Sequence, residues 1–151
     1  MRPPHTSVDL FSPTALAHPA ILVADDFRPT LDACVDALTR AGYAVRGVSD
    51  GRAAIERLRG ERYEVVVCNY RMEGITGLDV LESARRHSPG TPVVLLSGMP
   101  SDAVNREARA RGVFAVLEKP LSMLELLATV RDALTAISGV GERAVRSEGQ
   151  P

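Results

Sequence analysis

The sequence predicts an α/β domain built on a doubly wound, five-stranded parallel sheet. Between residues 20 and 137, five short apolar runs alternate with five stretches of helical spacing. Four of the runs are almost continuously apolar, which is typical of parallel strands covered by helices on both faces. Alternation of this kind favours right-handed crossovers, so that successive strands lie parallel in one sheet. A chain of 151 residues is long enough to bury the core of one such domain.

The expected strands are short runs rich in Val, Ile, Leu and Ala. The second run is interrupted by Arg46 and Gly47, which suits a strand at the edge of the sheet. In chain order the runs are Ala20–Ala24, Ala44–Val48, Val65–Cys68, Pro92–Leu96 and Phe114–Leu117.

Each stretch that follows a strand has the spacing of a helix, and most end at a glycine or before a proline. The last of them opens with Ser122 and Glu125 in the spacing of a capping box. The apolar positions and stops are Leu31, Val35 and Leu38 before Gly42; Ala54, Ile55 and Leu58 before Gly60; Val80, Leu81 and Ala84 before Pro89; a stretch from Ser101 and Asp102 to Gly112; and Leu124, Leu127, Val130, Leu134 and Ile137.

The two ends of the chain differ in composition from this central domain. Residues 1–19 contain four prolines, and residues 138–151 are rich in glycine and polar residues. Both are poor in large apolar side chains, so we expect a flexible N-terminal leader (1–19), a domain (20–137) and a flexible C-terminal tail (138–151).

Composition excludes several classes of function. The formal net charge of -1 gives no electrostatic reason to expect direct binding of nucleic acid or of an anionic membrane. No apolar run has the length of a signal peptide or of a membrane span, so we expect a cytoplasmic protein. Cys34 and Cys68 lie in helix-like and strand-like segments, as small buried residues of a reducing compartment do. The scattered cysteines and histidines do not have the spacing of a zinc site.

Polar residues stand where the expected strands end. Five parallel strands and five helices match the flavodoxin-like strand order 2-1-3-4-5, which places a crevice at the carboxyl ends of the strands. Asp25 and Asp26, Asn69, Ser97 and Lys119 therefore converge on one edge of the sheet. One acid there could simply cap a helix. Two adjacent acids repel by on the order of 4 kcal/mol at about 4 Å, a cost that an oxygen-bound Mg²⁺ ion would relieve.

This set of residues resembles the phosphate site of the receiver domain of bacterial response regulators (the CheY-like family), over residues 20–137. The resemblance rests on Asp25 and Asp26, on Ser97-Gly98, on Glu118-Lys119-Pro120 and on the loop from Tyr70 to Gly77. It implies that the two acids and the backbone carbonyl of Arg71 bind Mg²⁺. It also implies that Ser97 and Lys119 contact a phosphoryl group and that the bond before Pro120 is cis.

Three positions depart from the family pattern. Asn69 stands where the family has the aspartate that accepts the phosphoryl group, and a neutral amide is a much weaker nucleophile. Glu73 replaces a proline of the following loop, and Val116 stands at the position of an aromatic switch residue. The resemblance therefore implies a degenerate receiver, or pseudo-receiver, in which Mg²⁺ binds weakly and Asn69 is not phosphorylated.

The expected function is that of a stand-alone, non-enzymatic module of two-component (phosphorelay) signal transduction, with no second domain after Ile137. Its partner would be a histidine kinase or another signalling protein. In the family, the fourth helix, fifth strand and fifth helix form the interaction face, which can also form a homodimer. Arg106, Arg109 and Arg111 make the fourth helix basic, as an acidic partner would require, although a solvated helix face looks the same.

Two alternatives remain open from the sequence. The acceptor aspartate of an active phosphorelay receiver could have been replaced by engineering or by recent mutation. The chain could instead be a phosphatase similar to haloacid dehalogenases, although those enzymes require an Asp-x-Asp motif where this chain has Asp25, Asp26 and Phe27.

Overall fold

The structure, a computed structural model, describes residues 18–98 and 102–149, and the side chains as far as residue 137. Its main sheet has five parallel strands in the order β2-β1-β3-β6-β7. Counted over these five strands, the order is the predicted 2-1-3-4-5, with the broken second strand at an edge. The strands are β1 (Ala20–Ala24), β2 (Ala44–Val48), β3 (Val65–Asn69), β6 (Val93–Ser97) and β7 (Ala115–Glu118).

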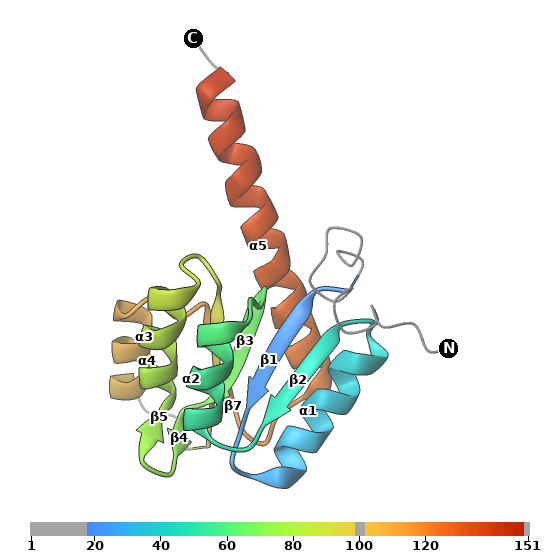
Figure 1. Ribbon diagram of the computed structural model, residues 1–151, viewed down its shortest axis with the longest axis vertical. Helices are drawn as coiled ribbons and strands as arrows, with labels where there is room; N and C mark the ends of the chain where they lie inside the picture. The colour runs from blue at the N-terminus through green and yellow to red at the C-terminus, as the bar shows by residue number, and fades with distance from the viewer. Residues whose placement is uncertain (1–17, 99–101, 150–151) are drawn as a thin grey trace.

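Helices cover both faces of the sheet, as the continuous apolar runs predict (Figure 1). Helices α1 (Arg28–Arg40) and α5 (Met123–Gly149) pack on one face. Helices α2 (Gly51–Gly60), α3 (Gly77–His87) and α4 (Asp102–Ala110) pack on the other.

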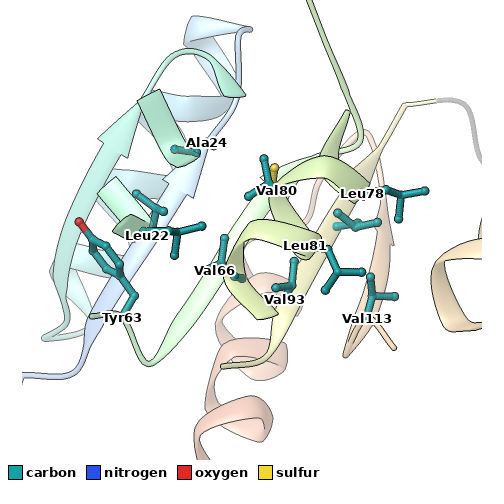
Figure 2. Close-up of a cluster of buried hydrophobic side chains, with 14 of the residues drawn as sticks. Leu22, Ala24, Tyr63, Val66, Leu78, Val80, Leu81, Val93 and Val113 are labelled. Atoms are coloured by element: carbon teal, nitrogen blue, oxygen red, sulfur yellow. The ribbon is translucent and has the colours of Figure 1, made fainter. Parts of the chain in front are cut away.

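Alternate residues of each central strand enter two separate cores. In β1, Leu22 and Ala24 face α2 and α3, while Ile21 and Val23 face α1 and α5. Figure 2 shows the first of these cores, where side chains from β1, β3, β6 and α3 meet. All five residues of β1, of β3 and of β6 are buried, so a polar residue has no low-cost position within these strands before their ends.

Local capping explains where several helices begin. The Ser122 hydroxyl accepts a hydrogen bond from the backbone N–H of Glu125, which confirms the predicted start of α5. Sequence reasoning missed a complete capping box at the start of α3, formed by Thr76 and Asp79. Asp50 caps α2 by accepting from the backbone N–H of Ala53.

Three strands, β3, β6 and β7, end one residue later than the sequence predicts, and a hairpin was missed. Asn69 pairs with Leu96 at the end of β3, and Ser97 ends β6, so both belong to the sheet. The chain then forms a two-stranded hairpin, β4 (Arg71–Met72) and β5 (Ile75–Thr76). Gly74 turns it with a φ of 76°, a value that only glycine adopts readily. These strands are too short to show a periodicity in the sequence.

Helix α5 continues past the predicted end at Ile137 as far as Gly149, so the helix is longer than the sequence predicts, while the flexibility of the tail stays a prediction. The segment contains no proline before Pro151, and its glycines each cost only about 1 kcal/mol relative to alanine. Figure 1 shows this part of α5 projecting beyond the sheet. No helix in the described part of the chain is long and apolar enough to cross a membrane. Most of the predicted leader, residues 1–17, lies outside the described residues, and the limits of the domain stay a prediction.

Close packing at Gly77 yields the first prediction. A Cβ atom there would lie 2.7 Å from the Leu95 side chain and 2.9 Å from the backbone oxygen of Asn69. Because backbone cannot move aside cheaply, we expect Gly77→Ala to destabilise the protein by about 1–3 kcal/mol in urea unfolding. Gly60→Ala is the matched control, since nothing lies within 4 Å of a Cβ at Gly60, also in a helix. Equal unfolding free energies for the two variants would contradict this account.

Candidate functional site

The ends of β3, β6 and β7 bring the predicted polar residues together at one edge of the sheet. Asn69 and Ser97 are the last residues of neighbouring strands, and Lys119 directly follows β7. A small pocket of about 130 Å³ opens between them, lined by Asn69, Tyr70, Arg71, Ser97, Gly98 and Lys119. The structure therefore brings Asn69, Ser97 and Lys119 together at this edge.

Asp25, at the end of β1, is a fully buried carboxylate. Its Oδ2 atom lies 2.9 Å from Nζ of Lys119, and its Oδ1 atom accepts a 2.9 Å hydrogen bond from the backbone N–H of Phe27. A buried charge is tolerated only when it is paired and hydrogen-bonded, and both conditions are met. The ion pair joins residues 94 positions apart in the chain and so ties β1 to the end of β7.

Lys119 is the only lysine among the 18 Lys and Arg residues of the chain. Its backbone N–H donates to the carbonyl of Ser97 at 2.8 Å, and the bond to Pro120 is cis, as the family resemblance implies. The ammonium lies 6.0 Å from the centre of the Phe27 ring, at the outer limit of a cation–π contact. A compact ammonium on a flexible stem fits this confined position, where the wide, planar fork of an arginine would need more room.

Asn69 is almost fully buried, with 8% of its surface exposed. Its Nδ2 atom donates a 2.6 Å hydrogen bond to the carbonyl oxygen of Arg71. The turn between them is held on both sides, because the N–H of Tyr70 donates to Leu96 and its carbonyl accepts from Gly77, each at 2.7 Å. The amide side chain is thus part of a fixed backbone arrangement.

The oxygen atoms at this edge suit Mg²⁺ in type but are already engaged. Mg²⁺ prefers carboxylate and carbonyl oxygens in an octahedral arrangement. Of the predicted ligands, Asp25 accepts from Lys119 and Phe27, and the Arg71 carbonyl accepts from Asn69. Asp26 is exposed, and among the described residues no group of three or more His, Cys, Asp or Glu could hold a metal ion. The oxygen atoms available as metal ligands therefore do not fit Mg²⁺ in this arrangement.

Three predicted positions are not among the residues that line the pocket. Asp25 is buried and ion-paired to Lys119, Asp26 is exposed, and Val116 is partly buried against the core that contains α3 and α4. Phe114, the nearest aromatic residue, lies before β7 and is 38% exposed. Sequence reasoning missed Tyr70 and Gly98 as lining residues, and their positions directly after Asn69 and Ser97 are the signal that could have found them.

The chain belongs to the response regulator receiver domain family, whose profile matches residues 21–131. Proteins of this family are receiver modules of two-component signal transduction, and such domains generally bind Mg²⁺ at their phosphorylation site. This membership confirms the resemblance on which the sequence analysis relied. It also leaves the phosphatase alternative without support.

Similar proteins include whole response regulators. The chain is 38% identical over 125 residues to the probable transcriptional regulatory protein TcrX of Mycobacterium tuberculosis, covering 80% of this chain and 51% of that protein. It is 32% identical over 127 residues to the response regulator MprA of Mycolicibacterium vanbaalenii, covering 82% and 55%. The chain thus spans about half the length of these relatives, and the predicted lack of direct nucleic-acid binding stays a prediction.

A solved structure supports the same assignment. The chemotaxis response regulator CheY4 of Vibrio cholerae is 28% identical, with a TM-score of 0.72 over 78% of this chain and 99% of that one. The likeness covers nearly the whole of that protein, so the two share the flavodoxin-like fold.

The buried ion pair yields a second prediction. Lys119→Met leaves the Asp25 carboxylate without its cation, and Asp25→Asn leaves the ammonium without its anion. We expect the double variant to be more stable than the sum of the two single effects predicts, with a coupling of about 1–3 kcal/mol in a double-mutant cycle. This coupling energy is smaller than that expected for a fully buried ion pair, because 20% of the Lys119 side chain is exposed to solvent. Additive effects would show that the contact contributes nothing.

Cys34, on α1 behind the site, yields a third prediction. Burial, and after it the charge of Asp25, raises the pKa of the Cys34 thiol from 9.0 to about 11. The folded protein therefore holds the thiol proton more tightly than the unfolded chain does. The resulting contribution to the free energy of unfolding is complete below pH 9 and is lost as the pH rises towards 11. We expect Cys34→Ala to make the decline in unfolding free energy over that range shallower by about 1 kcal/mol per pH unit, since one proton sets an upper limit of about 1.4 kcal/mol per unit. Urea unfolding at pH 8 to 10.5 measures this, and parallel slopes for the two proteins would refute it.

Proposed function

We propose that this chain is a pseudo-receiver, which signals by binding a protein partner and not by accepting a phosphoryl group at position 69. The observation that carries the proposal is the hydrogen bond from the Asn69 amide to the Arg71 carbonyl. In this bond the side chain at the end of β3 is a hydrogen-bond donor held in place. Phosphoryl transfer at that position would need a free, anionic group to accept the phosphoryl group.

The chemistry of the amide supports this proposal. Receiver phosphorylation requires a carboxylate oxygen to attack phosphorus in line and to form an acyl phosphate. A carboxamide is neutral, and its nitrogen lone pair is delocalised, so it cannot form that anhydride. In this proposal Asn69 occupies the acceptor position, Ser97 and Lys119 form a remnant of the phosphate pocket, and Val116 replaces the aromatic switch. Asp25, Asp26 and the Arg71 carbonyl are the remnant of the metal site.

The partner surface that we propose is formed by α4, β7 and α5. Arg106 and Arg109 on α4, with Arg111 just beyond it, are exposed and favour a partner with acidic groups. A histidine kinase, another signalling protein or a second copy of the chain would each fit this description. The buried free cysteines accord with a cytoplasmic location, which stays a prediction.

The fourth prediction tests the acceptor. Wild type and Asn69→Asp are incubated with Mg²⁺ and a small phosphodonor such as acetyl phosphate, and labelling is followed by intact mass. We expect no gain of phosphate by wild type. The Asn69→Asp variant should gain one phosphate, because Ser97 and Lys119 are still in place. Asn69→Ala is the matched control, which should stay unlabelled. A phosphate on wild type would contradict the proposed function.

Partner recovery separates this function from its alternative. Wild type and the phosphorylated Asn69→Asp variant are each used to capture partners under the same conditions. The same partners with both proteins would support a constitutive module. A set that changes only on phosphorylation would favour an active receiver whose aspartate was replaced.

A further inference from the structure

Two oxygen acceptors at the site, one on Arg71 and one on Asp25, each have a donor from within the chain. The Arg71 carbonyl accepts from Nδ2 of Asn69 at 2.6 Å, and Oδ2 of Asp25 accepts from Nζ of Lys119 at 2.9 Å. Both donors carry positive charge, partial on the amide and full on the ammonium. The oxygens that a cation would use are therefore already balanced by the chain itself.

An aspartate at position 69 would behave differently. A carboxylate is an acceptor only, so it could not donate to the Arg71 carbonyl. The two oxygen groups, held about one hydrogen bond apart by β3 and the turn after it, would repel each other unless a cation lay between them. The carboxamide removes this repulsion because one of its two arms is a donor.

We propose that the Asn69 carboxamide takes the place of the divalent cation. Its N–H group occupies the Arg71 carbonyl, excludes the ion and holds the turn after β3 in one arrangement at any Mg²⁺ concentration. This inference rests on the proposed function, which it deepens by explaining why the module is constitutive. The oxygen atoms of the site then have hydrogen-bond partners without a metal ion.

The surrounding contacts limit the alternatives open to the amide. Tyr70 is fixed on both sides of the turn by backbone hydrogen bonds to Leu96 and Gly77, so the Arg71 carbonyl cannot swing away freely. A carbonyl oxygen has a second lone pair, but a cation placed there would lie beside the positively polarised amide. To bind, the ion must displace the amide and leave a nearly buried donor unpaired, which carries a desolvation cost.

Mn²⁺, a paramagnetic probe for Mg²⁺ sites, tests the inference in the chain of 151 residues. Binding is followed by water-proton relaxation for wild type, Asn69→Ala and Asn69→Asp, with circular dichroism to show that each is folded. We expect Asn69→Ala to bind Mn²⁺ roughly tenfold more tightly than wild type, the equivalent of one hydrogen bond no longer displaced. Asn69→Asp should bind more tightly still, because it adds a carboxylate.

A second substitution locates the ion. Asp26 is exposed, so Asp26→Asn should leave the fold intact. In the Asn69→Ala background it should abolish the gain in Mn²⁺ affinity, which places the ion at this edge of the sheet. A gain that persists would place the ion elsewhere and overturn the inference.

The comparison between wild type and Asn69→Ala decides the matter. Equal affinities, whether both bind or neither does, would show that the amide does not exclude the ion, and the inference would be wrong. The proposed function would survive that result, since it is tested separately by phosphate gain on wild type and by partner recovery. The two experiments therefore separate the two ideas.

Discussion

The burial of the parallel sheet on both faces is the constraint on which the rest of the structure depends. Every residue of β1, β3 and β6 is buried. An unpaired charged side chain within these strands would therefore enter one of the two apolar cores. Polar chemistry is therefore confined to the places where strands end. Because all five strands are parallel, their carboxyl ends lie along one edge, and residues far apart in the chain meet there. The site is a consequence of the sheet, and its composition depends on which residue ends each strand.

Charge balance at that edge then determines what the site can do. The buried Asp25 carboxylate requires a cation, and Lys119 supplies one. A second carboxylate at the end of β3 would need a further cation, whereas the Asn69 amide needs none. In the pseudo-receiver that we propose, a single amide in place of an acid would remove both the nucleophile and the need for a metal. The two losses have one physical origin, which is the exchange of an acceptor for a donor.

Most of the fold could be predicted from the sequence because burial on both faces leaves a direct pattern. The apolar runs located all five strands to within one residue, and Arg46 and Gly47 marked the edge strand. The hairpin around Gly74 could not be found, since two-residue strands have no period. The length of α5 was misjudged because glycine and polar residues weaken a helix without ending it. At the site, the sequence placed Asn69, Ser97 and Lys119 at one edge of the sheet, but the hydrogen bond from Asn69 to Arg71 depends on the shape of a turn that no spacing encodes.

The same contacts caution against inferring phosphoryl chemistry from an acid and a lysine alone. Asp25 and Lys119 form an ion pair that joins β1 to the end of β7, so each has a structural reason to be present whether or not a phosphoryl group ever arrives. All the other Lys and Arg residues of the chain are arginines. The one lysine lies where an ammonium must reach a buried carboxylate. In our proposal, what separates a receiver that is switched from one that only binds is therefore the side chain that ends β3. There, a carboxylate leaves an electrostatic imbalance that phosphoryl transfer and a metal can use, and an amide leaves none.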